Sequence, residues 1–587
     1  MQVKLIRMLA LTVALVCVLG TVCACENPFK KEQTSEESTD EIVSNIASYV
    51  IVRSVEAGKT EAQICSNLKD LFASNGLNVS VEKEDKITIS GDTDKLYIMI
   101  GETSLSLSKT NQARVSKTTA SFLMEDNCLS VCASNDQVLW LAIEHMVQKC
   151  MKDGAFVLSE EYRDMQKDYS SQLRDGWTFQ FPAYTVGNLN EQLYSCGYGL
   201  VQGGDLSYMH TINETNAQEF DQWKQTVTAC GYREVFSNGI EDDQYVCYQG
   251  AFGTLYYAQF LNDLGKVNVI CDTVSVALDE FCYTIESDDH PEFYMFQTNV
   301  LGMEDLFLIH ASDDSWIVID GGTAGYGEFP ETFGDEIFEF MANRSEMVNG
   351  KLVISAWYVS HAHRDHFTGF GSLLKLHAKE IELQRVMLNV PDPKIHLLTE
   401  IDHLENDGQN AAFKVLADLI NSQYPNVKVI KVHTGMEIKL ADVSFTILHT
   451  QEDLLETWYG GNAEWDLTNF NMTSLVSMIE MDGMKILELA DNFRPDLTLN
   501  HYAMDSTLAC DILKVGHHYN DRQGDLFYKQ LYDTCAFEYA LIPWSQFDRP
   551  GTYMQEKLKD RFVCSSSEDS FGFYFDGSEI VCNKYQN

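Results

Sequence analysis

Three histidines and an aspartate lie within six consecutive residues of the segment SHAHRDHFTGF, which begins at Ser360. His361 and His363 are two residues apart, and side chains two apart on a strand point to the same face. We expect Asp365 and His366 on the turn beyond that strand, where they can serve a second ion. Imidazole and carboxylate ligands together suit zinc, iron or manganese, with zinc the first choice. The spacing therefore predicts a metal site in this segment.

Strands must deliver these side chains to one point. The residues WYVS before the histidines predict a buried strand that ends at the cluster. Three further segments are apolar runs that end at an acidic residue or a histidine pair: WIVIDGG, KILELADN and DILKVGHH. We also expect a hairpin turning at Asp482 and Gly483 and an amphipathic helix in AAFKVLADLINSQYP. Strand pairs interspersed with helices over about 300 residues predict two sheets sandwiched between helices.

On these motifs, residues 290–587 resemble the metallo-β-lactamase-fold hydrolases, whose domain is a four-layered αββα sandwich. The resemblance implies that Asp320, in an early Asp-Gly-Gly turn, braces the site and that Asp491 bridges two metals. It implies these metal ligands: His361, His363, Asp365, His366, Asp491 and either His517 or His518. Asp365, His366 and Asp491 would be the catalytic residues.

Within that family, the chain is similar to the extracellular domain of competence DNA-uptake channels. Those domains carry VGQGDS, N-x-x-S-L-V and LKVGHHGS, and the counterparts here are LGMEDL, NMTSLV and LKVGHHYN. The first of these motifs contains Asp305, to which we assign a structural supporting role. The transmembrane channel of those proteins is missing, and Ala490 replaces the glycine before the bridging aspartate. The resemblance therefore implies the site and not DNA uptake.

The first metal lacks one expected ligand. Many family members supply a third histidine there from a Gly-His-x-x-Gly segment, which this sequence does not contain. Asn471 or His449 occupies the neighbourhood and is a candidate ligand. His449 could equally be a strand-end histidine whose hydrogen bonds are satisfied within the fold.

The resemblance implies hydrolysis by activated water. Two divalent ions about 3.5 to 4 Å apart can share one water and lower its pKa toward ~7. A phosphoester or phosphodiester substrate fits the similarity to the competence domain. His518 or Lys514 could stabilise charge or donate to the leaving group, although either could instead lie outside the reaction. The alternative function is a catalytically degenerate surface protein that binds a glycan or another protein.

The first 25 residues have the form of a bacterial lipoprotein signal peptide: basic Lys4 and Arg7, an apolar run, and small residues before Cys25. Cleavage there would leave Cys25 as a lipid anchor, followed by a polar tether over residues 26–39. We therefore expect an extracytoplasmic protein that is anchored by lipid to the bacterial cell membrane. No later apolar run reaches the length of a spanning helix. The thirteen cysteines beyond Cys25 are scattered, and we expect mostly buried thiols.

Two smaller α+β domains are predicted before the hydrolase-like part, at residues 40–175 and 181–286, so the fold class is mixed α/β. In the first we expect helices in TEAQICSNLKDLFASNG and NDQVLWLAIEHMVQKCMKDG, the latter stopped by Gly154, and strands in KITISG and KLYIMIG. In the second, aromatic strands alternate with one helix, and we expect its tyrosines to pack within the sheet.

The chain is strongly acidic, with 42 Lys and Arg residues against 87 Asp and Glu residues and a formal net charge of −45. A molecule of this charge repels polyanions, which argues against long nucleic acid as a partner. We expect a small-molecule or cell-surface substrate. The sequence does not predict an oligomeric state.

Overall fold

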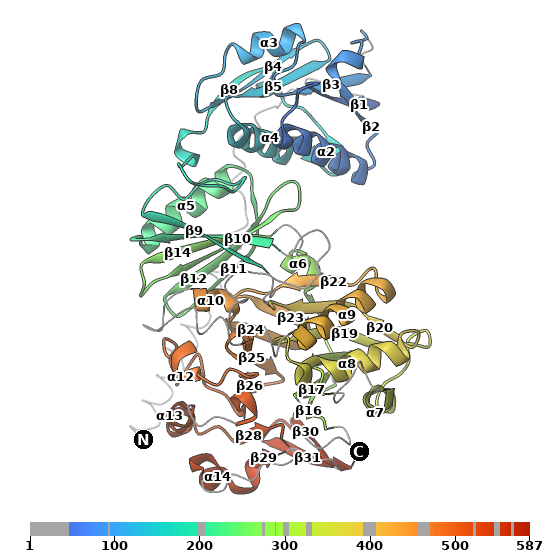
Figure 1. Ribbon diagram of the computed structural model, residues 1–587, viewed down its shortest axis with the longest axis vertical. Helices are drawn as coiled ribbons and strands as arrows, with labels where there is room; N and C mark the ends of the chain where they lie inside the picture. Colours follow the sequence, from blue (N-terminus) through green and yellow to red (C-terminus); the bar gives the residue numbers. More distant parts are fainter. Residues whose placement is uncertain are drawn as a thin grey trace, which may run out of the picture.

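The computed structural model describes residues 46–91, 94–195, 206–272, 276–287, 289–297, 305–323, 331–390, 407–455, 470–519, 524–544, 552–564 and 569–586. The expected signal peptide and tether, residues 1–39, lie outside the described residues. The described parts stack along the long axis of the molecule, with the N-terminal sheet at one end and the C-terminal sheets at the other (Figure 1). No helix in the described ranges has the length and apolar character needed to cross a membrane.

The N-terminal sheet has six strands in the order β2-β1-β3-β5-β4-β8. Its strands are β1 (Ser48–Arg53), β2 (Val79–Lys83), β3 (Lys95–Ile100), β4 (Thr119–Glu125), β5 (Cys128–Ala133) and β8 (Asp164–Asp168). Its helices are α2 (Lys59–Ser74), α3 (Ser106–Gln112) and α4 (Asp136–Cys150). Helices α2 and α4 pack on the same face of this sheet (Figure 1).

Two sequence predictions in this region are wrong in detail. KITISG forms no strand: Lys86 ends a 3-10 helix, and only one of its two isoleucines meets a core, since Ile87 packs against a small cluster whereas Ile89 is 39% exposed. Helix α4 ends at Cys150, before Gly154, because residues 151–156 form a small hairpin, β6 (Met151–Lys152) and β7 (Ala155–Phe156). Gly154 supplies the positive φ of 78° that this tight turn requires.

The middle sheet is antiparallel, with the order β11-β12-β13-β14-β10-β9. Its elements are β9 (Asn188–Ser195), β10 (Leu206–Asn213), α5 (Ala217–Ala229), β11 (Arg233–Ile240), β12 (Asp243–Gln249), β13 (Leu255–Leu261) and β14 (Lys266–Asp272). Neighbouring tyrosines on β13 face opposite ways: Tyr256 joins the core shared with the N-terminal sheet, and Tyr257 joins the C-terminal core. Both are buried, as expected for residues that pack within a sheet.

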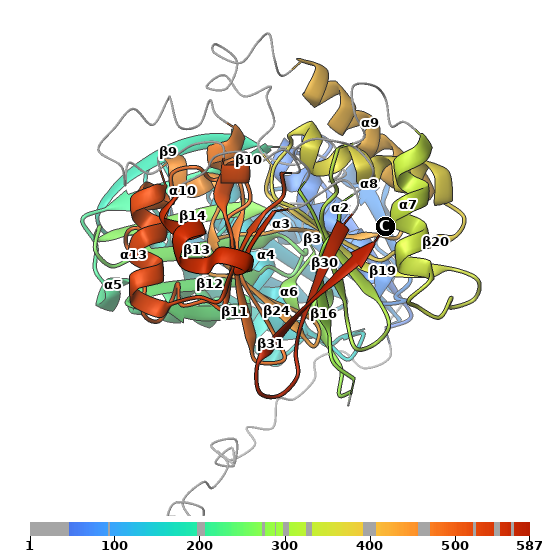
Figure 2. The same ribbon diagram turned by 90° about the horizontal axis from the view of Figure 1, so that it is seen from below.

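Two sheets face each other in the C-terminal part, with helices on both outer faces (Figure 2). One sheet contains β15 (Tyr283–Thr284), β23 (Glu437–Ala441), β24 (Val443–His449), β25 (Val476–Met481), β26 (Met484–Glu488), β27 (Ile512–Lys514), β28 (Tyr539–Ile542) and β29 (Phe562–Cys564). The other contains β16 (Glu292–Met295), β17 (Leu306–His310), β18 (Trp316–Asp320), β19 (Leu352–Val359), β20 (Ile381–Leu383), β21 (Arg385–Leu388), β22 (Lys428–Lys431), β30 (Asp569–Phe575) and β31 (Ile580–Gln586).

Helices cover the outer face of each C-terminal sheet, and the apolar residues of each element face the core. α7 (Glu331–Ala342), α8 (Arg364–His377) and α9 (Asp407–Gln423) cover the sheet that contains β19, and α13 (Asp525–Cys535) and α14 (Tyr553–Leu558) cover the other (Figure 2). Strand β18 shows the alternation: Trp316 and Val318 pack against the helices, whereas Ile317 and Ile319 enter the core between the sheets. The helix expected in AAFKVLADLINSQYP and the hairpin at residues 482–483 are both present.

Candidate metal centre

The site residues lie at the ends of strands from both C-terminal sheets. β18 and β19 run parallel and so end at the same edge, and β26 and β27 do the same in the facing sheet. Asp320 is the last residue of β18, and His361 follows β19 directly after Ser360. Asp491 and His518 follow β26 and β27 in the same way. Four segments that are far apart in sequence therefore converge.

Helix α8 begins inside the histidine cluster. Asp365 and His366 were expected on a turn, but both belong to the first turn of this helix, with His363 as its N-cap residue. The His366 N–H donates to the His363 carbonyl at 3.0 Å, and the His366 side chain is fully buried. A rigid helical turn therefore fixes the angle between His363, which is partly exposed, and His366, which points inward.

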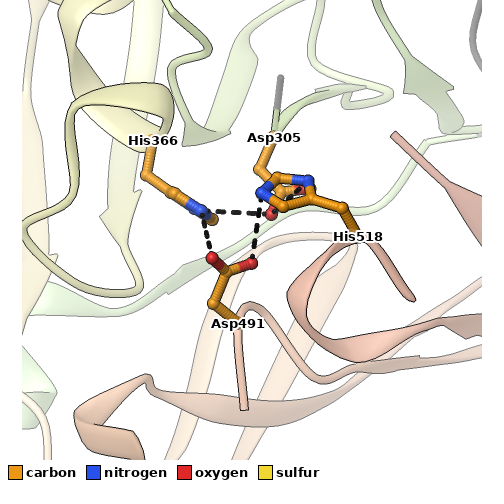
Figure 3. Close-up of side chains that lie close together, drawn as sticks. All are labelled: Asp305, His366, Asp491 and His518. Atoms are coloured by element: carbon orange, nitrogen blue, oxygen red, sulfur yellow. Dashed lines mark ion pairs between the residues drawn. The ribbon is translucent and has the colours of Figure 1, made fainter. Parts of the chain in front are cut away.

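One group of four side chains could hold a metal ion (Figure 3). Its members, each offering one ligand atom within 4.8 Å of the others, are Asp305, His366, Asp491 and His518. His366 Nε2 lies 3.2 Å from Asp491 Oδ2 and 3.3 Å from Asp305 Oδ2, and His518 Nε2 lies 3.6 Å from Asp491 Oδ1. Asp305, assigned a supporting role from the sequence, thus lies among the candidate ligands.

A second group contains His361, His363 and Asp491, whose ligand atoms also lie within 4.8 Å of one another. Asp491 belongs to both groups, and its Oδ2 lies 3.8 Å from His361 Nε2. A carboxylate shared by two clusters of imidazole ligands has the arrangement of a bridge between two ions.

The donor atoms themselves fit bound cations. Buried polar atoms in proteins almost always have a hydrogen-bond partner. Several buried atoms of these groups have none within the described part of the chain: Asp305 Oδ1, His361 Nε2, His366 Nε2, Asp491 Oδ1 and His518 Nδ1. Their nitrogen and carboxylate chemistry suits zinc, iron or manganese.

Asp320 fixes the orientation of His366. Its Oδ2 lies 2.7 Å from His366 Nδ1, while Oδ1 accepts from the Ser360 N–H at 2.8 Å and Oδ2 accepts from the Ser360 hydroxyl at 2.7 Å. With the proton on Nδ1, the Nε2 lone pair of His366 faces Asp491 and Asp305. The turn after Asp320 packs closely on α8: a Cβ at Gly321 would lie 2.5 Å from Phe370 Cβ.

Asp365 and His517 lie beside the two groups and not within them. His518 Nε2 is 3.2 Å from Asp365 Oδ2, and the Asp365 side chain is 29% exposed, so this carboxylate borders the opening of the site. His517 Nε2 is 3.2 Å from Asn471 Nδ2. Of the adjacent histidines, His518 is therefore the member of the candidate ligand group, and His517 lies next to the other candidate, Asn471.

His449 has a partner of its own. Its Nε2 lies 3.1 Å from the Met472 carbonyl oxygen, and its Nδ1 lies 3.5 Å from Asp453 Oδ2. It belongs to neither ligand group among the described residues. Its Nε2 is thus paired within the fold, as the strand-end alternative requires, whereas its Nδ1 has no hydrogen-bond partner among the described residues.

Lys514 is a buried cation at the centre of the site. Its side chain has no exposed surface, and its Nζ donates to Asp305 Oδ2 at 2.7 Å and to the Ala490 carbonyl. Asp491 Oδ1 and Glu488 Oε1 lie 3.8 and 4.0 Å from the same nitrogen. From the sequence, this lysine was one of two candidates for charge stabilisation. The only signal that could have placed it inside is its position in an otherwise apolar strand.

The buried environment sets the charges of these groups. Burial lowers the pKa of His361 well below its usual value and that of His363 to about 4. Both imidazoles are therefore neutral near pH 7, as metal ligation requires. Burial raises the pKa of Glu488 to about 8. Burial lowers the pKa of Lys514, but the adjacent carboxylates of Asp305 and Glu488 outweigh that effect, so the Lys514 pKa is raised as well.

Several residues at the site have a strained backbone. Non-glycine residues with positive φ include Asp320 (57°), Ala490 (46°), His517 (48°) and His518 (50°). Such conformations cost about 1 to 3 kcal/mol each and persist where the surrounding fold requires them. Here they turn the ends of three strands so that their side chains meet.

No family model matches this chain, and no curated protein matches it. Among solved structures, it is similar to CmlA, a diiron beta-hydroxylase from Streptomyces venezuelae, with 10% identity and a TM-score of 0.26 over 52% of this chain and 55% of that one. It is also similar to a mutant flavo di-iron protein from Thermotoga maritima, with 10% identity and a TM-score of 0.20 over 63% of this chain and 61% of that one. In both cases the match spans less than two thirds of the other protein, and at these values the function of neither transfers to this chain.

Proposed function

We propose that this chain is a metal-dependent hydrolase of the metallo-β-lactamase fold with a dinuclear site. The observation that carries the proposal is the position of Asp491, which belongs to both groups of candidate ligands. His361 and His363 would hold one ion, and Asp305, His366 and His518 the other. Two ions so held would lower the pKa of a shared water and offset the negative charge that develops at the attacked centre.

The residues around the ligands prepare the site. Asp320 keeps the proton of His366 on Nδ1, and Lys514 balances the carboxylates that burial would otherwise destabilise. Asp365, at the partly exposed edge, is hydrogen-bonded to His518, and we propose that it orients that ligand.

A phosphoester or phosphodiester is the substrate class we propose. The support is the similarity of LGMEDL, NMTSLV and LKVGHHYN to motifs of the competence domain. Arg364 adds to it: this partly exposed residue follows the candidate ligand His363 directly in sequence, and guanidinium groups pair well with phosphate oxygens. With a net charge of −45, a small substrate fits better than a long polyanion. We further propose that Cys25 anchors the protein at the bacterial cell surface.

Metal content and substrate turnover together test this function. The chain from residue 26, purified without chelator, should contain about two zinc, iron or manganese ions by elemental mass spectrometry. It should hydrolyse bis(p-nitrophenyl) phosphate or p-nitrophenyl phosphate in preference to a β-lactam. Asp491→Ala should lose most of the metal and the turnover, whereas His377→Ala, at the far end of α8, should keep both.

Two results would separate the alternatives. Failure to bind any of these metals, even when they are supplied, would overturn the catalytic proposal and favour a surface binding protein. Full metal loading with no phosphoester turnover would retain the metal centre and reject the substrate class.

A further inference from the structure

A short segment of the chain, residues 471–475, forms one wall of the metal centre directly before β25, and we call it the wall segment. The N–H of Asp491 donates to the Ser474 hydroxyl oxygen at 3.3 Å. The N–H of Leu475 donates at 3.0 Å to the carbonyl of Ser360, which directly precedes the histidine cluster. The wall segment therefore holds the backbone at the bridging aspartate and at the start of that cluster.

The wall segment is buried and makes a third contact with the metal centre. Ser474 and Leu475 have no exposed surface, and Asn471 is only 7% exposed. The Nδ2 of Asn471 lies 3.2 Å from His517 Nε2, and the Asn471 carbonyl accepts the N–H of Ser474 at 3.3 Å. Because the three contacts reach residues that follow β19, β26 and β27, a shift of this segment would disturb three strand ends at once.

His449 ties the wall segment to β24. It is the last residue of that strand, it is 1% exposed, and its Nε2 lies 3.1 Å from the Met472 carbonyl oxygen. A carbonyl oxygen only accepts hydrogen bonds, so Nε2 carries a proton and donates it to this bond. Met472 belongs to the wall segment, and this bond therefore sets the position of the segment relative to β24.

The middle sheet supports β24 at the same end. Ile447, two residues before His449, makes two backbone hydrogen bonds with the turn at residues 434–436, at 2.8 and 2.9 Å. Two side chains of the middle sheet, those of Tyr257 and Asn238, donate to carbonyls of the same turn. The position of His449 thus depends on contacts with the middle sheet, and its role is best tested in the full chain.

We propose that His449 is a positioning residue for the metal centre and acts through the wall segment, a role that rests on the proposed dinuclear site. Its Nε2–H fixes the Met472 carbonyl, and the wall segment in turn fixes the backbone of Asp491 and of the residue before His361. His361, His363 and Asp491 would hold one of the two ions. That ion should depend on His449, because groups that orient metal ligands tune the affinity for the metal.

Calorimetric titration with zinc, on the metal-free chain from residue 26, tests this role. The wild type should bind two ions. His449→Leu, which lacks the donor, should bind one ion with wild-type affinity and the other at least ~10-fold more weakly. His449→Gln keeps an N–H donor for the Met472 carbonyl and should restore the lost affinity.

Ser474→Ala tests the next contact and does not depend on how His449→Leu folds. It removes the acceptor of the Asp491 N–H and should weaken the same ion. Ser355→Ala is the matched control, because Ser355 is a fully buried serine of β19 whose hydroxyl donates to the Trp316 carbonyl at 3.1 Å. This control should bind both ions as the wild type does.

The possible results separate this role from the proposed function. Wild-type affinity for both ions in His449→Leu and Ser474→Ala would overturn the role, and so would equal losses in His449→Leu and His449→Gln. Equal weakening of both ions would indicate a general loss of structure and would also overturn it. A wild-type chain that binds no zinc would instead reject the dinuclear site itself, and this role with it.

Discussion

At the scale of single residues, the site concentrates buried charge. Asp305, Asp320, Glu488 and Asp491 are almost fully buried together, and Lys514 is the buried lysine in contact with this group. A buried charge that loses its partner is costly, whereas an exposed ion pair contributes little. The buried lysine is therefore a requirement for assembling the carboxylates, separate from any part it has in catalysis.

We expect Lys514→Met to destabilise the metal-free protein by about 3 to 5 kcal/mol, because Asp305 loses its ammonium partner in the interior. Lys485→Met is the matched control: its ammonium lies 3.0 Å from Glu480, and both side chains are 46% exposed, so the cost should stay below about 1 kcal/mol. Urea unfolding of both variants in chelator measures the difference. Equal midpoints would mean that Lys514 does not compensate these carboxylates.

Asp320→Asn should weaken metal binding by about 10- to 100-fold while leaving the ligands in place. The amide is neutral and no longer favours the His366 tautomer that presents Nε2 to the site. Competition with a fluorescent chelator measures the affinity. Asp418→Asn, on the exposed face of α9, controls for loss of a surface carboxylate and should bind metal as the wild type does. An unchanged affinity in Asp320→Asn would rule out the bracing role.

Some of this site could be predicted from the sequence, and the reason is local. His361, His363 and His366 are neighbours in the chain, so that their spacing alone shows that they can meet. The place of Asp305 beside His366 could not be derived in this way, because it depends on how β17 pairs with β18 and on the first turn of α8. The sequence also could not show that His518, and not His517, is the candidate ligand. The direction of the two side chains depends on the positive φ angles at both residues.

At the scale of elements, apolar periodicity predicted those strands and helices whose faces meet a core. The hairpin at residues 482–483 and helix α9 were found, since both have one clearly buried face. The strand expected in KITISG was wrong because only Ile87 packs against a core, whereas Ile89 is exposed. The predicted end of α4 was wrong because a local hairpin, the pairing of β6 with β7, takes the place of the last helical turn.

Helix α4 carries an acid whose protonation links it to the middle sheet. Glu144 is 1% exposed and accepts from the Ala251 N–H at 2.6 Å and from Trp140 Nε1 at 3.2 Å. Burial raises the pKa of Glu144 to about 7. The stability that the protonated carboxyl contributes to the folded state is therefore complete below its unfolded pKa of about 4.3 and is lost as pH rises through 7. We therefore expect Glu144→Gln, which stays neutral, to be more stable than the wild type at pH 8 by about 1 to 3 kcal/mol.

The measurement for Glu144 is the midpoint of thermal unfolding at pH 4 and at pH 8. The advantage of Glu144→Gln should vanish at pH 4, where the wild-type carboxyl is itself protonated. Glu161→Gln, an exposed position close in sequence, should change neither midpoint. An advantage of equal size at both pH values would show that the effect is not one of protonation.

At the scale of the whole molecule, buried charges join the middle sheet to the C-terminal sheets. Asp272, at the end of β14, lies 2.9 Å from Lys431 Nζ and 2.6 Å from His433 Nε2. His433 Nδ1 in turn lies 2.8 Å from Glu452 Oε1, and all four side chains are at most 6% exposed. Glu452 lies in α10 (Gln451–Leu455), which directly follows His449 and Thr450. The middle sheet is thus tied to the junction between β24 and α10.

Asp272→Asn should lower the midpoint of unfolding substantially, by the equivalent of about 3 to 5 kcal/mol at pH 6, because buried Lys431 and His433 each lose an adjacent counter-charge, although His433 keeps Glu452. Burial lowers the pKa of His433, but Asp272 and Glu452 raise it by more, so the pKa is raised overall. The stability that the charged His433 contributes is therefore complete below its unfolded pKa of about 6.5 and is lost as pH rises through its pKa in the folded protein. The cost should therefore be smaller at pH 9 than at pH 6. Asp279→Asn, which breaks the exposed pair with Arg233, should cost under about 1 kcal/mol at both. Urea unfolding at the two pH values measures these costs. A loss of stability in Asp272→Asn that does not change with pH would mean that Lys431 alone, and not His433, stabilises the contact between the sheets through Asp272.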